Sequence, residues 1–233
     1  MVSVDKSNKT ANFEDEYYLL SPSDIRIYPL IYEDCKKQVC SIDEYDKCEN
    51  VPDCPAYYIK KNKIVNPQPV EIDFLTVYCN NKVEYADCYM GLSLSGSSFV
   101  VSPKLYRILQ SLGIAGIQFI PVTLVEKDEV IYTDFIYVHC FNFLPILSVK
   151  NSKYQTSEKG RKISNNLLQI KFNSKQLNKI KLENRLIFRF PLARSYFIIH
   201  ISVVEKLLSV NPIGVQFVKI SAINSPDIAG ILI

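Results

Sequence analysis

Apolar and polar positions recur along most of the chain with the spacing of strands and, in two places, of helices. Alternating or continuous apolar runs predict strands at 17–20, 25–32, 69–78, 116–125, 130–144, 167–172, 185–190, 196–201 and 214–220. The charged turn over 126–129 predicts a hairpin between two of these strands. We therefore expect a chain rich in short strands.

Two stretches have helical spacing instead. Ser102-Pro103 predicts a helix start, because serine can cap free backbone N–H groups and proline fits the first helical position. Apolar residues then recur every three or four positions, at Leu105, Ile108, Leu109 and Leu112. Gly113 suits the end of this helix, since glycine accepts the left-handed conformation of a C-terminal cap. A second helix is expected at about 202–210.

These two regions resemble each other at a constant offset of 98 residues. The segment 98–122 aligns with 195–220, and Gly116-Ile117-Gln118-Phe119 matches Gly214-Val215-Gln216-Phe217. Both segments predict strand, helix, glycine and strand, which indicates an internally duplicated unit. The alternative is that any two amphipathic strand–helix–strand stretches look alike.

The pattern predicts an α+β fold in which two helices cover a mixed sheet. Hydrophobic residues make up 48% of the 233 positions, which is ample for a packed core. Residues 1–16 are expected to be a flexible polar tail and 17–233 a single domain, with two lobes, 17–149 and 150–233, as the alternative. The polar stretch 150–166 predicts a surface loop. Nothing in the pattern predicts an oligomeric state.

The net charge of +3 hides a strong polarity along the chain. Residues 1–149 carry 13 Lys and Arg against 20 Asp and Glu, whereas residues 150–189 carry 11 against 2. This basic strip could follow a nucleic-acid backbone, so a small nucleic-acid-binding or regulatory protein is an alternative function. We favour a solvated face, because its lysines alternate with polar loop and strand positions.

The ends and the hydropathy of the chain bear on location. The first 20 residues are polar and charged where a secretory signal needs an apolar run of roughly 7–15 residues. No stretch approaches the roughly 20 apolar residues of a membrane helix. The sequence therefore predicts a cytoplasmic protein that has no membrane partner.

Seven cysteines are present, and four of them cluster. Cys35, Cys40, Cys48 and Cys54 lie within 20 residues, which is compatible with a structural zinc site or with free thiols in a loop. An odd cysteine count in a reducing compartment argues against a disulfide framework. No other cofactor is expected.

Catalytic motifs are not evident. The two histidines, His139 and His200, fit structural positions, and adjacent strand residues such as His139 and Cys140 point to opposite faces. No phosphate-binding glycine loop and no Gly-x-Ser-x-Gly elbow occurs. We therefore expect a protein without enzymatic activity.

The run FVVSPKLYRILQSLGIAGIQFIPV (99–122) resembles the signature of a group of immunity proteins from bacterial polymorphic-toxin systems. The later GVQF copy and the upstream run EIDF…EYADCYMGLSLSGSSFVVS are similar to that group as well. The closest resemblance is to immunity protein family forty-three and its double-Cys-x-x-Cys-Gly cousins, over residues 48–220. This chain departs from the cousins, because only Cys54-Pro55 of their Cys-Pro-x-Cys-Gly motif is present.

The resemblance implies a protein that binds and neutralises a cognate secreted toxin domain in bacterial competition. An acidic stretch, 33–54, carries seven acidic against three basic residues and is a candidate for the toxin-binding surface. Its candidate contact residues are Asp43, Glu44, Tyr45, Asp46 and Glu49. An acidic loop could occupy the basic cleft of a nucleic-acid-degrading toxin, and tyrosine is a favoured interface anchor. An ordinary solvated loop is the alternative.

Overall fold

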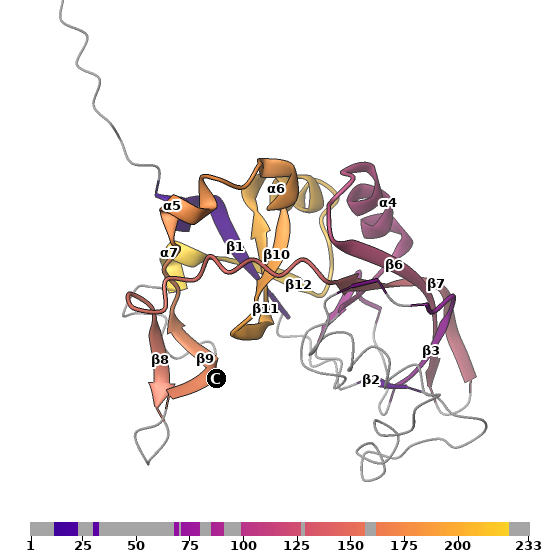
Figure 1. The fold of residues 1–233 in the computed structure, drawn as a ribbon. Helices are drawn as coiled ribbons and strands as arrows, with labels where there is room; N and C mark the ends of the chain where they lie inside the picture. Colours follow the sequence, from indigo (N-terminus) through magenta and orange to yellow (C-terminus); the bar gives the residue numbers. More distant parts are fainter. Residues whose placement is uncertain are drawn as a thin grey trace, which may run out of the picture.

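The computed structural model describes residues 12–22, 30–32, 68–69, 71–79, 85–90, 99–126, 129–156 and 162–223. The strands of these residues form three sheets, and two helices of two or more turns lie side by side along one edge of the molecule (Figure 1). The α+β class predicted from the sequence is confirmed.

The first sheet has four antiparallel strands. Their spatial order is β10 (Ile187–Phe190), β11 (Ala193–His200), β1 (Tyr17–Pro22) and β12 (Val215–Lys219). Helix α6 (Ile201–Leu208) follows β11 directly and covers one face of this sheet. The N-terminal strand therefore lies inside a sheet built from the C-terminal part of the chain.

The second sheet has six strands and is mixed. Its order is β2 (Leu30–Tyr32), β3 (Leu75–Cys79), β6 (Ile117–Glu126), β7 (Glu129–Cys140), β5 (Phe99–Val101) and β4 (Cys88–Met90). Strands β3 and β6 are parallel and all other neighbours are antiparallel. Helix α4 (Pro103–Ser111) connects β5 to β6. The two predicted helices thus cover two sheets instead of one.

Shorter elements complete the described fold. Strands β8 (Lys153–Thr156) and β9 (Lys162–Gln169) form a two-stranded sheet. The short helices are α1 (Phe13–Glu16), α5 (Ser174–Leu177), the 3₁₀ turn η2 (Leu182–Asn184) and α7 (Ile220–Ile223).

The predicted duplication is confirmed, and it extends to the strand register. Strands β5 and β6 pair on either side of β7, and β11 and β12 pair on either side of β1. Val100 pairs with Tyr137 as Ile198 pairs with Leu19. The five pairs from Ile117↔Cys140 to Pro121↔Ile136 correspond one by one to Val215↔Pro22 through Lys219↔Tyr18. We call these units repeat 1 (β4–β5–α4–β6 with β7) and repeat 2 (β10–β11–α6–β12 with β1).

Backbone conformation repeats at the same offset of 98. Gly113 and Asn211 both have positive φ angles, of 56° and 48°, and so do Gly116 and Gly214, at 71° and 83°. The residue before each helix is anchored alike: the N–H of Ser102 donates to the Asp87 carbonyl, and that of His200 donates to the Leu186 carbonyl. The equivalence therefore covers the helix ends and the edge hairpins as well as the strands.

The central strands of the two repeats come from different places in the chain. Strand β7 directly follows β6 and pairs with it as a hairpin within repeat 1, whereas β1 precedes all of repeat 1 in sequence but lies in repeat 2. The edge strands add contacts between the repeats, because β4 contacts β1 and β10 contacts β7. Repeat 2 is therefore complete only with a strand from the N-terminal part of the chain.

One apolar core joins the two repeats. Helices α4 and α6 contact each other above it, and their buried side chains share it with strands of both sheets. Its members include Leu105, Leu109, Phe99, Val203, Leu207, Phe197 and Ile199. The rings of Phe99 and Phe197, which occupy equivalent positions, meet edge-to-face with centroids 4.9 Å apart. Burial of this surface is the main force holding the halves together.

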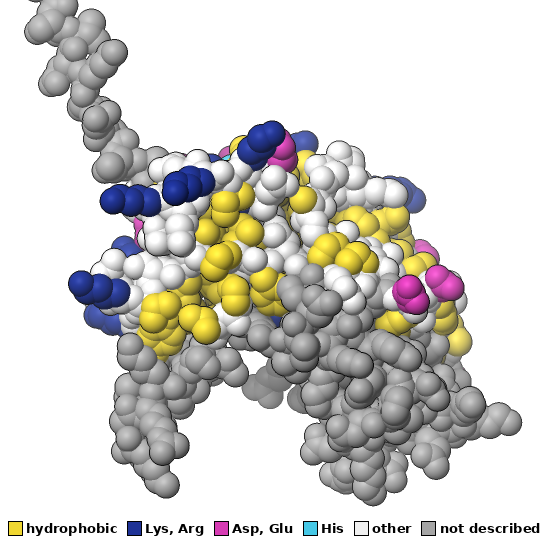
Figure 2. Space-filling view, viewed as in Figure 1, with side chains coloured by type: hydrophobic (Ala, Val, Ile, Leu, Met, Phe, Trp, Pro, Cys, Tyr) yellow, Lys and Arg dark blue, Asp and Glu magenta, His cyan; other side chains and the backbone are white. Residues whose placement is uncertain are grey.

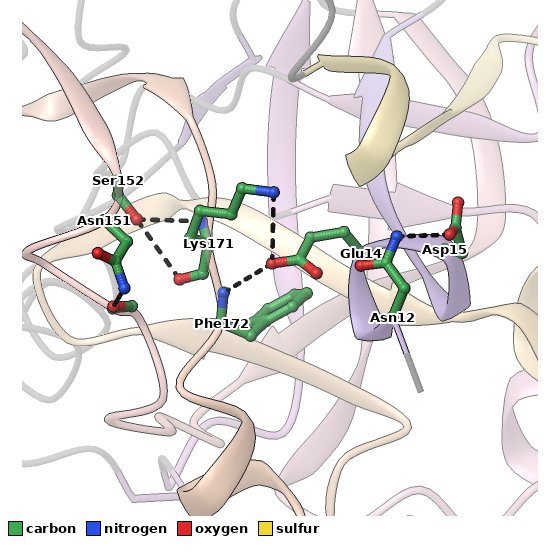
Figure 3. A network of polar contacts seen from close by, with 8 residues as sticks. Asn12, Glu14, Asp15, Asn151, Ser152, Lys171 and Phe172 are labelled. Carbon is green, nitrogen blue, oxygen red and sulfur yellow. Dashed lines mark hydrogen bonds and ion pairs between the residues drawn. The ribbon is translucent and has the colours of Figure 1, made fainter. Parts of the chain in front are cut away.

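A second core lies on the other face of the four-stranded sheet. Helix α1 inserts Phe13 there, and the Glu14 carboxylate accepts a hydrogen bond from the backbone N–H of Phe172 and lies 4.0 Å from the Lys171 ammonium (Figure 3). Ser152 exchanges hydrogen bonds with the backbone of Lys171. Residues 13–16 of the tail expected over 1–16 thus belong to the folded structure.

Three local predictions differ from the structure. The loop expected over 150–166 contains β8 and part of β9, which pair with each other in a two-stranded sheet. The strand expected over 69–78 begins only at Leu75. The Ser102 side chain donates to Asp87 instead of capping α4.

Gly214 and Gly113 offer a matched test of the backbone requirements. An added Cβ at Gly214 would lie 2.5 Å from the Ala86 Cβ, whereas one at Gly113 would meet no atom within 4 Å. Both residues have positive φ, so Gly113→Ala should cost about 1–2 kcal/mol of unfolding free energy from strain alone. Gly214→Ala should cost about 3 kcal/mol or more because overpacking adds to that strain. Urea unfolding measures both, and equal losses would contradict the close approach.

The N-terminal origin of β1 predicts how two parts of the chain behave apart. Residues 150–233 lack β1, the strand between β11 and β12, so this fragment should not unfold cooperatively on heating when expressed alone. Mixed or coexpressed with residues 1–149, it should elute together with them, and the pair should regain a single thermal transition. Cooperative unfolding of residues 150–233 by themselves would contradict this interpretation.

Candidate partner-binding surface

The site residues predicted from the sequence lie outside the described residues. These are the contact candidates Asp43, Glu44, Tyr45, Asp46 and Glu49 and the metal candidates Cys35, Cys40, Cys48 and Cys54. The acidic toxin-binding surface and the zinc site therefore stay predictions. Within the described ranges, no group of three or more His, Cys, Asp or Glu side chains is placed to hold a metal ion.

Asp87 is a fully buried carboxylate between the repeats. It accepts hydrogen bonds from the Ser102 hydroxyl at 2.7 Å and from the Ile213 N–H at 2.9 Å, and the Lys104 ammonium lies 2.6 Å away. Burial alone would raise the pKa of Asp87, but these donors outweigh it and the pKa lies below its usual value. The carboxylate thus fastens the loop before β12 to the start of α4, which is a structural role.

His200 caps α6. Its Nδ1 accepts the backbone N–H of Ser202 at 3.2 Å, and its ring meets Tyr17 edge-to-face. Burial lowers the pKa of His200, and Arg185 adds to this, while Glu16 and Glu205 oppose it. The Arg185 guanidinium donates to the Tyr17 hydroxyl at 2.8 Å. Burial raises the pKa of Tyr17 to about 12, so this hydroxyl stays protonated at neutral pH.

The basic strip 150–189 does not form one continuous exposed face. Arg189 is fully buried, with its guanidinium over the rings of Phe143 and Phe197, and Arg185 lies over the ring of Phe13. In Figure 2, Lys and Arg side chains gather on the side of the molecule that carries α5, and hydrophobic side chains are exposed across the middle of the face. Two of the strip's arginines thus hold the core together.

A groove lies between helix α6 and strand β12. Its volume is about 440 Å³, and its lining is mostly apolar, including Tyr18, Val204, Leu208, Val215 and Phe217. Leu208 is 49% exposed at the rim. Groove and ligand-site volumes of roughly 300–1,000 Å³ suit a few side chains or a small ligand. We refer to this feature as the α6–β12 groove.

The strand that borders the groove also ends its sheet. Strand β12 pairs with β1 on one side, and no strand in the described part of the chain pairs with its other side. An unpaired strand edge beside an apolar groove is a surface that favours binding of a protein segment.

No protein-family model matches the chain, and no curated protein matches it. Among the described residues, no helix is long and apolar enough to span a membrane.

The sequence alone did not single out this groove. The helix at 202–210 and the strand at 214–220 were predicted, but a groove between them was not. The available signal was a difference between the aligned repeats: Val204 occupies the position of Tyr106, while the phenylalanine of the following strand is present in both repeats.

His200 predicts a pH dependence of stability. The pKa of His200 in the folded protein lies below its usual value of 6.5, so the unfolded chain takes up the proton first as pH falls. The free energy of unfolding should therefore fall as pH drops below about 6.5. His200→Asn can still accept the Ser202 N–H bond, because asparagine is a good N-cap, and it should show a smaller fall between pH 7.5 and 5. Identical pH slopes in urea unfolding would contradict this assignment.

Proposed function

We propose that the chain is a non-catalytic protein-binding protein that neutralises a cognate toxin domain in the cytoplasm of a bacterium. The observation that carries the proposal is the α6–β12 groove at an unpaired strand edge. The resemblance of residues 48–220 to polymorphic-toxin immunity proteins supports the same function. Stoichiometric binding requires no catalytic residue and no cofactor.

The buried polar groups support binding more than catalysis. Asp87 is occupied by Ser102, Lys104 and Ile213, and His200 caps a helix. A general base needs a reachable substrate proton, and both side chains already hold parts of the fold in place. The acidic residues of 33–54 would add electrostatic steering to the encounter with a basic toxin.

Complex formation with the neighbouring toxin tests the proposal. The chain should form a 1:1 complex with the C-terminal domain of a large secreted protein encoded by the adjacent upstream gene. Coexpression of the two should also restore growth to cells that make that domain. Leu208→Asp should weaken the complex by about tenfold or more, because it places a charge at the apolar rim.

Leu182→Asp is the matched control for that variant. Leu182 is 44% exposed, close to the 49% of Leu208, but it lies in η2 and does not line the groove. We expect this variant to bind as the wild type does. Absence of any complex and of protection would overturn the function, while equal effects of both variants would move the binding surface elsewhere.

A further inference from the structure

The two repeats differ in one place that bears on binding, which is the space between the helix and the last strand. In repeat 1, Tyr106 of α4 packs edge-to-face on Phe119 of β6, with ring centroids 5.1 Å apart and planes at 72°. The offset of 98 places Val204 and Phe217 at the same positions in repeat 2. The strand register and the helix ends coincide there as well. Phe119 in repeat 1 thus has a tyrosine ring from its helix beside it, whereas the equivalent Phe217 in repeat 2 has a valine at that helix position.

The α6–β12 groove occupies the place of the missing ring. Both Val204 and Phe217 line it. Val204 itself is only 2% exposed, so the open part of the groove is bordered by more exposed lining residues such as Leu208 and Glu205. Edge-to-face aromatic pairs contribute about 0.5–1.5 kcal/mol beyond the area that they bury. An incoming aromatic ring would therefore recover in repeat 2 the contact that repeat 1 makes internally.

Charge at the rim adds to this geometry. In repeat 1 the residue after the tyrosine is Arg107, and its counterpart in repeat 2 is Glu205. Glu205 lines the groove, is exposed, and is the one carboxylate among the described lining residues. A cationic side chain beside the incoming ring would therefore lie near the Glu205 carboxylate, and the two charges would attract each other.

We propose that the α6–β12 groove binds a tyrosine side chain of the partner protein, with an adjacent arginine or lysine paired to Glu205. The ring packs on Phe217 as Tyr106 packs on Phe119, and its hydroxyl stays at the solvent-exposed rim. The partner segment lies along β12, whose outer edge can receive its backbone. This assignment rests on the proposed function for the identity of the partner, but the chemistry of the groove can be tested without it.

The first experiment uses a dipeptide probe. N-acetyl-tyrosyl-arginine amide is titrated into the full chain while the methyl resonances of Val204, Leu208 and Val215 are followed by NMR. We expect saturable shifts at these methyl groups. The probe with glutamate in place of arginine should bind about two- to fivefold more weakly, which is the range of an exposed ion pair. Absence of saturable shifts at these methyl groups would overturn the proposal.

Variants at the equivalent positions provide matched controls. Val204→Tyr fills the groove as in repeat 1 and should lower dipeptide affinity by about tenfold or more, with an unchanged or raised melting temperature. Tyr106→Val opens repeat 1 and should create a second site, seen as new shifts at Ile117 and Ile136. If Val204→Tyr does not fold, the exposed Glu205→Arg decides the charge contact, because it should reverse the preference between the two probes. Unchanged affinities in these variants would contradict the assignment.

The toxin domain separates this inference from the proposed function. Loss of toxin binding in Val204→Tyr supports both. If Val204→Tyr binds the toxin as tightly as the wild type does, the proposed function stands, but the groove is not the surface that contacts the toxin. If the wild-type chain binds the dipeptide but no toxin, the proposed function is wrong, whereas the assignment of the groove as a tyrosine-binding site stands. Concentration-dependent dimerisation that Val204→Tyr abolishes would show a second copy of the chain as the occupant and overturn the partner assignment.

Discussion

The placement of β1 is the constraint on which the rest of the structure depends. This strand lies between β11 and β12 in a sheet whose other members come from the C-terminal part of the chain, so that sheet and the core it shares with repeat 1 are completed only when distant segments meet. A sheet that lacks its central strand leaves two unpaired inner edges and an open core, both of which are costly in water. Strand β1 therefore ties the two copies of the motif together, since it pairs within repeat 2 but precedes repeat 1 in sequence. A boundary between lobes at residue 149 would separate β1 from its partners β11 and β12.

Hydrogen-bonded polar groups lie where the two repeats join. Asp87 in repeat 1 bonds to the loop of repeat 2 through Ile213, and Asn142 after β7 donates to the carbonyls of Asn184 and Ile187. Gly116 and Gly214 permit the close approach of these segments, because a Cβ at either would meet Asn142 or Ala86 at 2.5 Å. Hydrogen bonds at such a boundary specify which segments meet, while apolar burial supplies most of the stability.

Duplication also explains how a binding surface can arise without loss of the fold. In repeat 1, Tyr106 packs on Phe119, whereas repeat 2 has Val204 at the position of Tyr106 and a groove beside β12, whose outer edge pairs with no strand among the described residues. Because the packing of one repeat preserves the shared core, the other can vary its surface residues at small cost. The internal comparison therefore identifies the groove as a place where this chain departs from its own pattern.

The sequence by itself determined the α+β class, the positions of α4 and α6, the hairpin of β6 and β7, and the duplication, since each follows from local periodicity, glycine positions or a constant offset. It did not determine the division into separate sheets or the placement of β1 between β11 and β12, because the partners of β1 lie more than 100 positions away in the sequence. The role of Ser102 was decided in the same way, since a buried carboxylate from another element competes for its hydroxyl. The groove could be predicted only in part: the change from tyrosine to valine is visible in the aligned repeats, but only the tertiary structure places Phe217, Leu208 and an unpaired strand edge around that space.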